Sequence, residues 1–231
     1  MRVPFSHELL QEKAYRYLVE QINQKRFESG KVYSERQISA EIGISRTPFK
    51  DALTRLSQDK YIDIVPSKGF CLHEINQDDI REIYQIRTAI EGYCAIHLMN
   101  RIDTEEGKAC IQKMHKSLEE QDKMITGEDE NLQSFLLKED EFHLSIVEFS
   151  GNETFISLFS SYRHRIHMLA AESLITSGRM AETVKEHKRI VSAIEEKNEQ
   201  SVYDAVRKHM RSGRDINLKM FHAREKREST V

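Results

Sequence analysis

Residues 34–56, SERQISAEIGISRTPFKDALTRL, predict two short helices joined by a tight turn. Ser34 followed three residues later by Gln37 is the pattern of a capping box, in which the two side chains satisfy free backbone N–H groups at a helix start. Gly43 is expected to end the first helix, because glycine is favoured just past a helix C-terminus. Ser45 can then cap the second helix, so the stretch predicts a compact pair of helices.

The second of these helices is predicted to have one buried and one exposed face. Apolar residues at i, i+3, i+4 and i+7 form one stripe, made of Phe49, Ala52, Leu53 and Leu56. Arg46, Thr47 and Lys50 lie off that stripe near the helix start, directly after Ser45. A DNA-binding helix-turn-helix carries its base-reading and phosphate-binding side chains in these first turns. An ordinary helical hairpin with surface charges is the alternative interpretation.

Residues 61–75, YIDIVPSKGFCLHEI, predict a β-hairpin. Apolar residues alternate with others on both sides of a turn at 66–69, namely Ile62, Ile64, Phe70 and Leu72. With a first helix predicted over 6–24, three helices and a hairpin make a winged helix-turn-helix. Lys68 and Gly69 are expected at the wing tip, where a cation and a close backbone approach suit a phosphate or minor-groove contact. The wing therefore favours DNA binding over the ordinary hairpin.

The composition is that of a folded, mainly α-helical chain. Nine glycines and three prolines in 231 residues indicate few turns, and 39% hydrophobic with 32% charged residues is typical of a soluble protein. The longest apolar runs are too short to span a bilayer, and the N-terminal residues lack the apolar core of a signal peptide. Three cysteines without CxxC spacing indicate free thiols. We therefore expect a cytoplasmic protein with no membrane partner.

Length and charge both divide the chain into two predicted domains, 1–75 and 76–231. The first part holds 12 Lys and Arg against 10 Asp and Glu, and the second holds 23 against 28. The first part is therefore only weakly basic. Its affinity for DNA would have to come from a local patch and from doubling in a dimer, because bulk charge is too small.

Residues 76–231 predict an all-α helical bundle with one charge on a buried face. Ile80, Ile83, Tyr84 and Ile90 share an apolar stripe, and Arg87 falls on the same face. A buried charge needs a partner. Glu91, one helical turn further on, can supply a structural partner, and a bound anion is an equally weighted alternative.

Four polar residues lie on the inward faces of three other predicted helices: Glu139, His143, His187 and His209. Glu139 and His143 are four residues apart and stack on one face of their helix. Three neutral imidazoles and one carboxylate suit a divalent transition metal, with zinc preferred over nickel and manganese. The alternative is a polar core in which each histidine is simply hydrogen-bonded. His164, by contrast, is expected on the surface.

The N-terminal part resembles the DNA-binding domain of GntR-type bacterial transcription regulators. Those proteins typically carry a serine-arginine-threonine-proline-valine-arginine-glutamate-alanine-leucine stretch where this chain has residues 45–53, SRTPFKDAL. The resemblance implies operator contacts by Arg36, Arg46, Thr47 and Lys50, with Gly69 at the wing. Lys50 stands where arginine is usual, and the two are not equivalent at a bidentate contact.

The C-terminal part resembles the FCD ligand-binding domain of the FadR subfamily of GntR regulators. The resemblance is carried by residues 86–95, 139–152, 185–194 and 207–210, which read IRTAIEGYCA, EDEFHLSIVEFSGN, KEHKRIVSAI and RKHM. It implies a homodimer, a site of three histidines and an aspartate, and a small carboxylate effector with Arg87 as a salt-bridge partner. The aspartate position holds Glu139 here, with Asp140 one step nearer His143. Helix geometry favours Glu139, because Asp140 lies toward the edge of the stripe.

Together these features predict a dimeric transcriptional regulator, in particular a repressor, and not an enzyme. Two winged helices would bind a palindromic operator in double-stranded DNA, and a small organic or sugar acid at the metal site would change operator binding. A helical-bundle metalloenzyme acting on a small organic acid is the alternative from another class, because such bundles can host metal catalysis. A metal-free regulator with a satisfied polar core is the other alternative.

Overall fold

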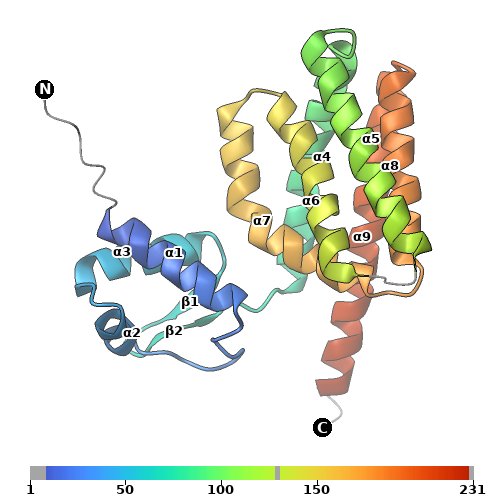
Figure 1. Ribbon diagram of the computed structural model, residues 1–231. Coiled ribbons are helices and arrows are strands. Elements are labelled where there is room, and N and C mark those ends of the chain that lie inside the picture. The colour runs from blue at the N-terminus through green and yellow to red at the C-terminus, as the bar shows by residue number, and fades with distance from the viewer. Residues whose placement is uncertain (1–8, 128–130, 229–231) are drawn as a thin grey trace, which may run out of the picture. The chain divides into compact units, whose positions relative to one another are not determined.

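The computed structural model describes residues 9–127 and 131–228 (Figure 1). The chain folds into two compact units, residues 1–75 and 76–231. The mainly helical fold predicted from the sequence is confirmed, with a winged helix-turn-helix followed by a helical bundle. Residues 6–8 of the predicted first helix lie outside the described part of the chain.

The N-terminal unit consists of three helices and a hairpin. Its elements are α1 (Leu10–Asn23), α2 (Glu35–Glu41), α3 (Arg46–Gln58), β1 (Ile62–Val65) and β2 (Gly69–Leu72). The stripe predicted for α3 is buried, and it joins apolar side chains from every other element. The core consists of Ala14, Leu18, Phe27, Ile38, Ile44, Phe49, Ala52, Leu53, Leu56, Ile62 and Phe70. This single cluster fixes α3 and leaves its first turns facing solvent.

The turn between α2 and α3 forms largely as the sequence predicts. The Ser34 hydroxyl accepts a hydrogen bond from the Gln37 backbone N–H, but the Gln37 side chain donates to Glu41, so only half of the predicted capping box forms. Gly43 has φ +66°, which explains why glycine ends α2. Ser45 is the N-cap residue of α3, yet its side chain makes no capping hydrogen bond.

The wing is a two-stranded antiparallel sheet that a third segment extends. Ile62 lies opposite Leu72, and Val65 lies opposite Gly69. The backbone of Tyr33, just before α2, pairs with Phe70 through hydrogen bonds of 2.7 and 3.0 Å. The wing is therefore joined to the start of α2, as well as to the end of α3.

Gly69 lies next to the turn of the wing, as the sequence predicts, but it is buried and does not offer the expected close backbone approach to DNA. Gly69 is buried at the start of β2, with φ +138°, and a Cβ atom there would lie 1.9 Å from the carbonyl oxygen of Tyr33. The glycine is thus required by close packing inside the domain. Lys68, in the turn that precedes it, is exposed as expected.

We expect Gly69→Ala to destabilise the N-terminal unit by at least about 2 kcal/mol, because the methyl group clashes with backbone and the φ value is strained. Gly43→Ala is the matched control. Its φ is also positive, but no atom lies within 4 Å of the added Cβ, so a loss of only about 1 kcal/mol is expected. Hydrogen exchange of the amides in residues 9–75 measures both losses. Equal protection in the two variants would contradict the packing explanation.

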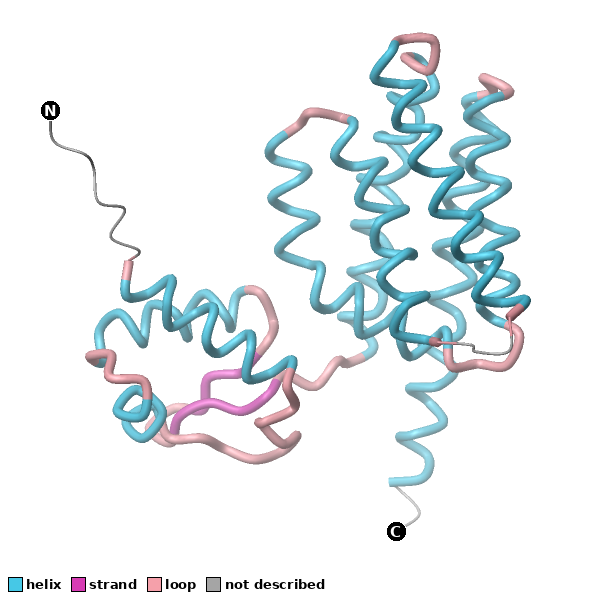
Figure 2. Tube along the Cα trace, viewed as in Figure 1, coloured by secondary structure: helices cyan, strands magenta, loops and turns pink. Residues whose placement is uncertain are grey.

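The C-terminal unit is a bundle of long helices (Figures 1 and 2). They are α4 (Gln77–Asn100), α5 (Glu105–Thr126), α6 (Leu132–Phe149), α7 (Glu153–Leu174), α8 (Arg179–Glu195) and α9 (Glu199–Glu228). Within the unit, α9 continues beyond the ends of its neighbours (Figure 1). The three cysteines are free. Among the described residues, no helix has the length and apolar character needed to cross a membrane.

Candidate functional site

Apart from the buried Gly69, the residues predicted to contact DNA are at the surface of the N-terminal unit. Ser45, Arg46, Thr47 and Lys50 are all exposed at the start of α3, opposite the buried stripe that begins at Phe49. The missing side-chain cap leaves the Ser45 hydroxyl available to another partner. This turn therefore presents two cations and two hydroxyl groups to solvent on a helix that is rigidly packed from behind.

Two further cations extend the exposed basic set. Arg36 lies in the first turn of α2, and Lys68 lies in the turn of the wing. Within the part of the chain that the structure describes, neither of them forms an ion pair, and the same holds for Arg46 and Lys50. Some other exposed cations of this unit do have partners, as Arg55 does with Glu12 at 2.7 Å. Unpaired cations can bind phosphate without first breaking an internal salt bridge.

In the C-terminal unit, the structure brings together all four residues predicted as metal ligands. One nitrogen or oxygen from each of Glu139, His143, His187 and His209 lies within 4.8 Å of every other, and all four residues are buried. The Nε2 atom of His143 is 3.2 Å from the Nε2 atoms of both other histidines and 3.2 Å from Oε1 of Glu139. The inward stripes of α6, α8 and α9 thus converge on one point.

Each histidine ring is oriented by a hydrogen bond at its other nitrogen. Nδ1 of His143 is 2.5 Å from Oε2 of Glu91, and Nδ1 of His209 is 2.8 Å from Oε2 of Glu186. Nδ1 of His187 is 3.1 Å from Oε1 of Gln121. All three partners accept hydrogen bonds, so each Nδ1 carries a proton and each ring turns its Nε2 atom toward the others.

The nitrogen and oxygen atoms at the centre of the cluster share one proton, which is on the ring of His143. Burial lowers the pKa of His143, but the carboxylates of Glu91 and Glu139 raise it to about 9. Burial and neighbouring cations keep the pKa of His187 well below its usual value. Burial raises the pKa of Glu139, yet His143 and Arg87 lower it to about 2. Three nitrogens and one carboxylate oxygen form a donor set that could hold a divalent transition metal.

Arg87 does pair with Glu91, which is one of the two partners that the sequence allows, but the pair leaves the guanidinium partly unsatisfied. Nε of Arg87 is 2.7 Å from Oε1 of Glu91, and Nη2 is 3.9 Å from Oε1 of Glu139. Nη2 is buried without a hydrogen-bond partner. A structural partner and a bound anion are thus compatible interpretations of the same residue.

A small cavity beside the cluster collects further unsatisfied polar atoms. Its volume is about 20 Å³, and it is lined by Arg87, Glu139, Arg179, Thr183 and His209, among others. Nε of Arg179 and Oγ1 of Thr183 are buried without a hydrogen-bond partner, as Nη2 of Arg87 is. Arg179 is also held by Glu186, at 2.7 Å from its Nη2. Three donors that lack acceptors therefore border one cavity next to the histidines.

Sequence reasoning missed Gln121, Glu186 and Arg179. Glu186 precedes His187, and nothing in the apolar stripe of α8 marks it as a buried residue. The useful signal is chemical. A buried histidine needs a hydrogen-bond partner for each ring nitrogen, so a carboxylate or amide close to it is a candidate partner.

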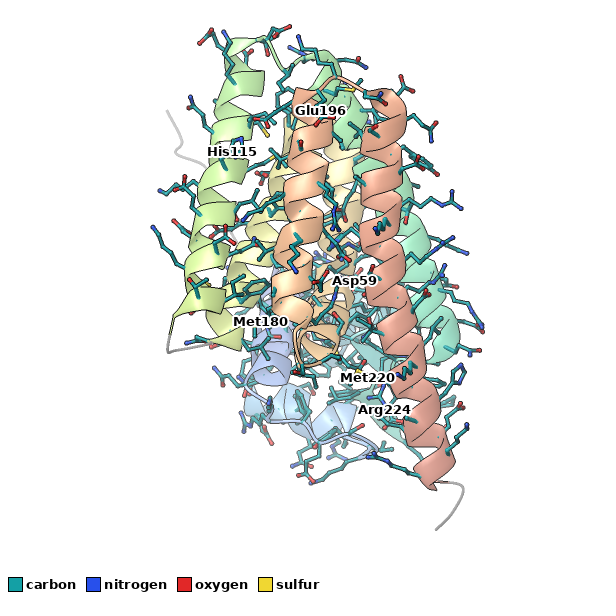
Figure 3. All side chains as sticks on the ribbon, turned by 90° about the vertical axis from the view of Figure 1, so that its right-hand side faces the viewer. Asp59, His115, Met180, Glu196, Met220 and Arg224 are labelled. Atoms are coloured by element: carbon teal, nitrogen blue, oxygen red, sulfur yellow. The ribbon has the colours of Figure 1, made fainter. Side chains whose placement is uncertain are left out.

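Other polar residues lie away from the cluster. Asp140 is partly buried on α6 and pairs with the exposed Arg163. His164, expected on the surface, is half-buried, and burial lowers its pKa to about 4. His115, labelled in Figure 3, lies on the outer face of α5 and contacts Glu195 at 2.7 Å.

Comparisons with known proteins agree with both units. The family model described as "FCD domain" matches residues 82–212, and the model described as "Bacterial regulatory proteins, gntR family" matches residues 10–72. Together these two matches cover most of the chain, and the first alone covers more than half of it.

Similar individual proteins are transcriptional regulators. The HTH-type transcriptional regulator YdhC of Bacillus subtilis (strain 168) is 27% identical over 84% of this chain and 85% of its own length. The HTH-type transcriptional repressor RspR of Escherichia coli (strain K12) is 22% identical over 86% and 85%. The structure of E. coli McbR/YncC has the same fold, with a TM-score of 0.66 and 16% identity over 92% of this chain and 98% of that one. The family models and the named relatives describe transcriptional regulators, as the sequence predicts, and not enzymes. The chain therefore belongs to the GntR family of bacterial transcriptional regulators and carries an FCD domain as its C-terminal part.

Proposed function

We propose that this regulator is a repressor whose operator binding is controlled by a small carboxylic acid at a metal site in the C-terminal domain. The observation that carries the proposal is the convergence of four acceptor atoms beside a cavity bordered by three unsatisfied donors. The acceptors suit a cation, and the donors suit an anion. A carboxylate that touches both would satisfy the two sets at once.

The proposed ligands of the metal are Glu139, His143, His187 and His209. The donor set suits zinc, nickel or manganese, and the rings are already oriented by Glu91, Gln121 and Glu186. A cation bound there must displace the proton of His143, so metal uptake releases a proton. The metal would offer a coordination position to the carboxylate of the effector.

Charge balance supports an effector with one negative charge. The buried ionic groups around the site are the cations Arg87 and Arg179 and the anions Glu91, Glu139 and Glu186. A divalent metal with three neutral histidines leaves this set with one positive charge in excess. Excess charge is costly in a buried site, so a monocarboxylate is favoured, such as a hydroxy acid or a sugar acid.

The size of the cavity supports a coupling between effector and conformation. A volume of about 20 Å³ holds about one water molecule, which is too little for an organic acid. The acid would therefore have to displace surrounding side chains or helices as it binds. We propose that this displacement favours one conformation of the C-terminal domain over another, and that the two conformations differ in operator affinity.

Operator recognition is assigned to the N-terminal unit of each protomer in a homodimer. Arg36, Ser45, Arg46, Thr47 and Lys50 would contact base edges or phosphates, and Lys68 would reach the backbone from the wing. A gel shift with DNA from upstream of the protein's own gene tests this assignment. Absence of a specific shift at low salt, with and without candidate acids, would contradict it.

Thr183→Val tests the effector site without disturbing the metal ligands. The substitution removes a buried hydroxyl group that has no partner, so we expect the metal-loaded protein to need about ten times more acid for the same change in operator binding. Metal content and operator affinity without acid should stay unchanged. The acid is taken from a screen of small hydroxy and sugar acids.

Ser173→Ala is the matched control for Thr183→Val. Ser173 lines the same cavity, but its hydroxyl already donates to the carbonyl oxygen of Ala170 at 3.1 Å. The acid response should therefore change little in this variant. An equal response in both variants and in the unchanged protein would show that Thr183 does not contact the effector.

A further inference from the structure

A second, larger groove lies on the outside of the C-terminal domain between α4 and α9. These helices are antiparallel and lie side by side, since Gly92 meets Tyr203 while Gln77 contacts His222 (Figures 1 and 3). The groove has a volume of about 560 Å³, which is within the usual range for sites of small molecules. Four arginines and no acidic residue are among its lining residues: Arg81, Arg207, Arg211 and Arg214.

The arginines of this groove are unusual for the domain in which they lie. Residues 76–231 carry five more acidic than basic side chains, and many exposed cations there are paired, such as Lys197 with Asp103. Arg81 and Arg214 contact Asp78 and Asp215. In the described part of the chain, Arg207 and Arg211 have no ion-pair partner. Two free guanidinium groups therefore face one groove.

The spacing of these arginines matches an extended anion better than a single carboxylate. Arg207, Arg211 and Arg214 are at i, i+4 and i+7 of α9, so they form one row about 10 Å long. In an exposed groove, one ion pair contributes little, because water screens it. Several arginines that each bind a negative oxygen of one ligand together raise the affinity for that ligand, particularly through bidentate hydrogen bonds with phosphate.

The floor of the groove is partly apolar. Ala89, Met210 and Leu218 line it, together with the exposed ring of Tyr203. A ligand with a flat or apolar part could cover these side chains while its anionic part contacts the arginines. The volume and this mixed lining fit a molecule of about the size of a nucleotide.

The groove is separate from the cavity beside the histidines. Tyr84 is the lining residue that both have in common. Its hydroxyl donates to Asn217 at 2.8 Å, and its ring packs so closely on α9 that a Cβ atom at Gly213 would be 2.6 Å from the hydroxyl oxygen. Tyr84 thus closes the wall between the two spaces.

We propose that the groove between α4 and α9 is a second ligand site, which binds a small molecule that carries two or more phosphate groups. The site is distinct from the proposed carboxylate site and does not depend on the metal. Tyr84 contacts both spaces, so a ligand in the groove is placed to affect the conformation of the inner cavity.

The test measures binding of inorganic pyrophosphate to the full chain by titration calorimetry at physiological salt. We expect Arg207→Gln combined with Arg211→Gln to weaken binding at least tenfold. The matched control combines Arg189→Gln with Lys116→Gln, which remove two exposed charges from α8 and α5 of the same domain. The control should keep the original affinity. Thermal unfolding confirms that both variants, altered only at exposed positions, remain folded.

Three outcomes would overturn the proposal. The first is absence of pyrophosphate binding by the unchanged chain. The second is an equal loss in the two double variants, which would show that only bulk charge matters. The third is a change of oligomeric state in the groove variant alone, measured by analytical ultracentrifugation, because the arginines would then contact another copy of the chain. Metal content is unaffected in every case, so failure here is distinguishable from failure of the proposed function.

Discussion

Purified without chelators, the protein should contain about one transition-metal ion per chain, and Glu139→Ala should reduce this to a small fraction. Glu139 supplies the one carboxylate oxygen near the three imidazole nitrogens, at 3.2 Å from Nε2 of His143. Its removal leaves a weaker three-nitrogen site in which Arg87 is no longer balanced by that charge. Elemental analysis by mass spectrometry measures the loss.

Asp140→Ala separates this explanation from a general effect of acidic residues on α6. Asp140 is the next residue along the helix, and its partly buried carboxylate pairs with the exposed Arg163. Its loss should leave metal content unchanged. The opposite result, with metal retained in Glu139→Ala and lost in Asp140→Ala, would show that Asp140, and not Glu139, is the carboxylate ligand.

Arg46→Ala should weaken operator binding by about ten- to a hundredfold, corresponding to about 1–3 kcal/mol. Arg46 is exposed in the first turn of α3 and has no ion pair with another described residue. The loss is expected mainly for the specific operator, because a base contact supplies sequence discrimination, while affinity for unrelated DNA should fall less. Fluorescence anisotropy with both DNAs measures the two effects.

Lys13→Ala is the control for charge alone. Lys13 is exposed on α1 of the same unit, outside the segment assigned to DNA recognition. Its removal should change both affinities by less than about threefold if a single remote charge matters little. Arg46 would lose its assigned role if the two variants weakened binding to operator and unrelated DNA by the same factors.

The ligand set of the candidate metal site could be predicted because it follows helical periodicity. Glu139 and His143 share one stripe on α6. His187 is buried on α8, and His209 is buried on α9. The apolar neighbours of each residue fix which face turns inward, so three stripes are enough to bring the side chains together.

The residues that orient the histidines could not be found by the same reasoning. Gln121 falls on the apolar stripe of α5, so periodicity places it inward but does not say which side chain it meets, and Glu186 is next to the stripe residue His187 on α8. Their role becomes visible only when α5, α8 and α9 are packed. Periodicity assigns faces of one helix, whereas hydrogen-bond partners depend on how neighbouring helices are placed.

The wing shows the same limit for β structure. The alternation of Ile62, Ile64, Phe70 and Leu72 correctly predicted two strands. The pairing of Tyr33 with Phe70 has no signature near either residue, because it joins segments far apart in the chain. Without that pairing, the glycine at position 69 looked suited to a contact with DNA, whereas the structure explains it by the Tyr33 carbonyl group.

The most direct test of the proposed regulation is the operator affinity of metal-loaded protein, measured across a panel of small hydroxy and sugar acids, and repeated with His187→Ala. We predict that at least one acid changes the affinity of the unchanged protein by about tenfold or more. The same acid should have no effect on the His187→Ala variant, which still binds the operator. An equal acid response in both proteins, or no response to any acid in the presence of metal, would contradict control of DNA binding through the histidine cluster.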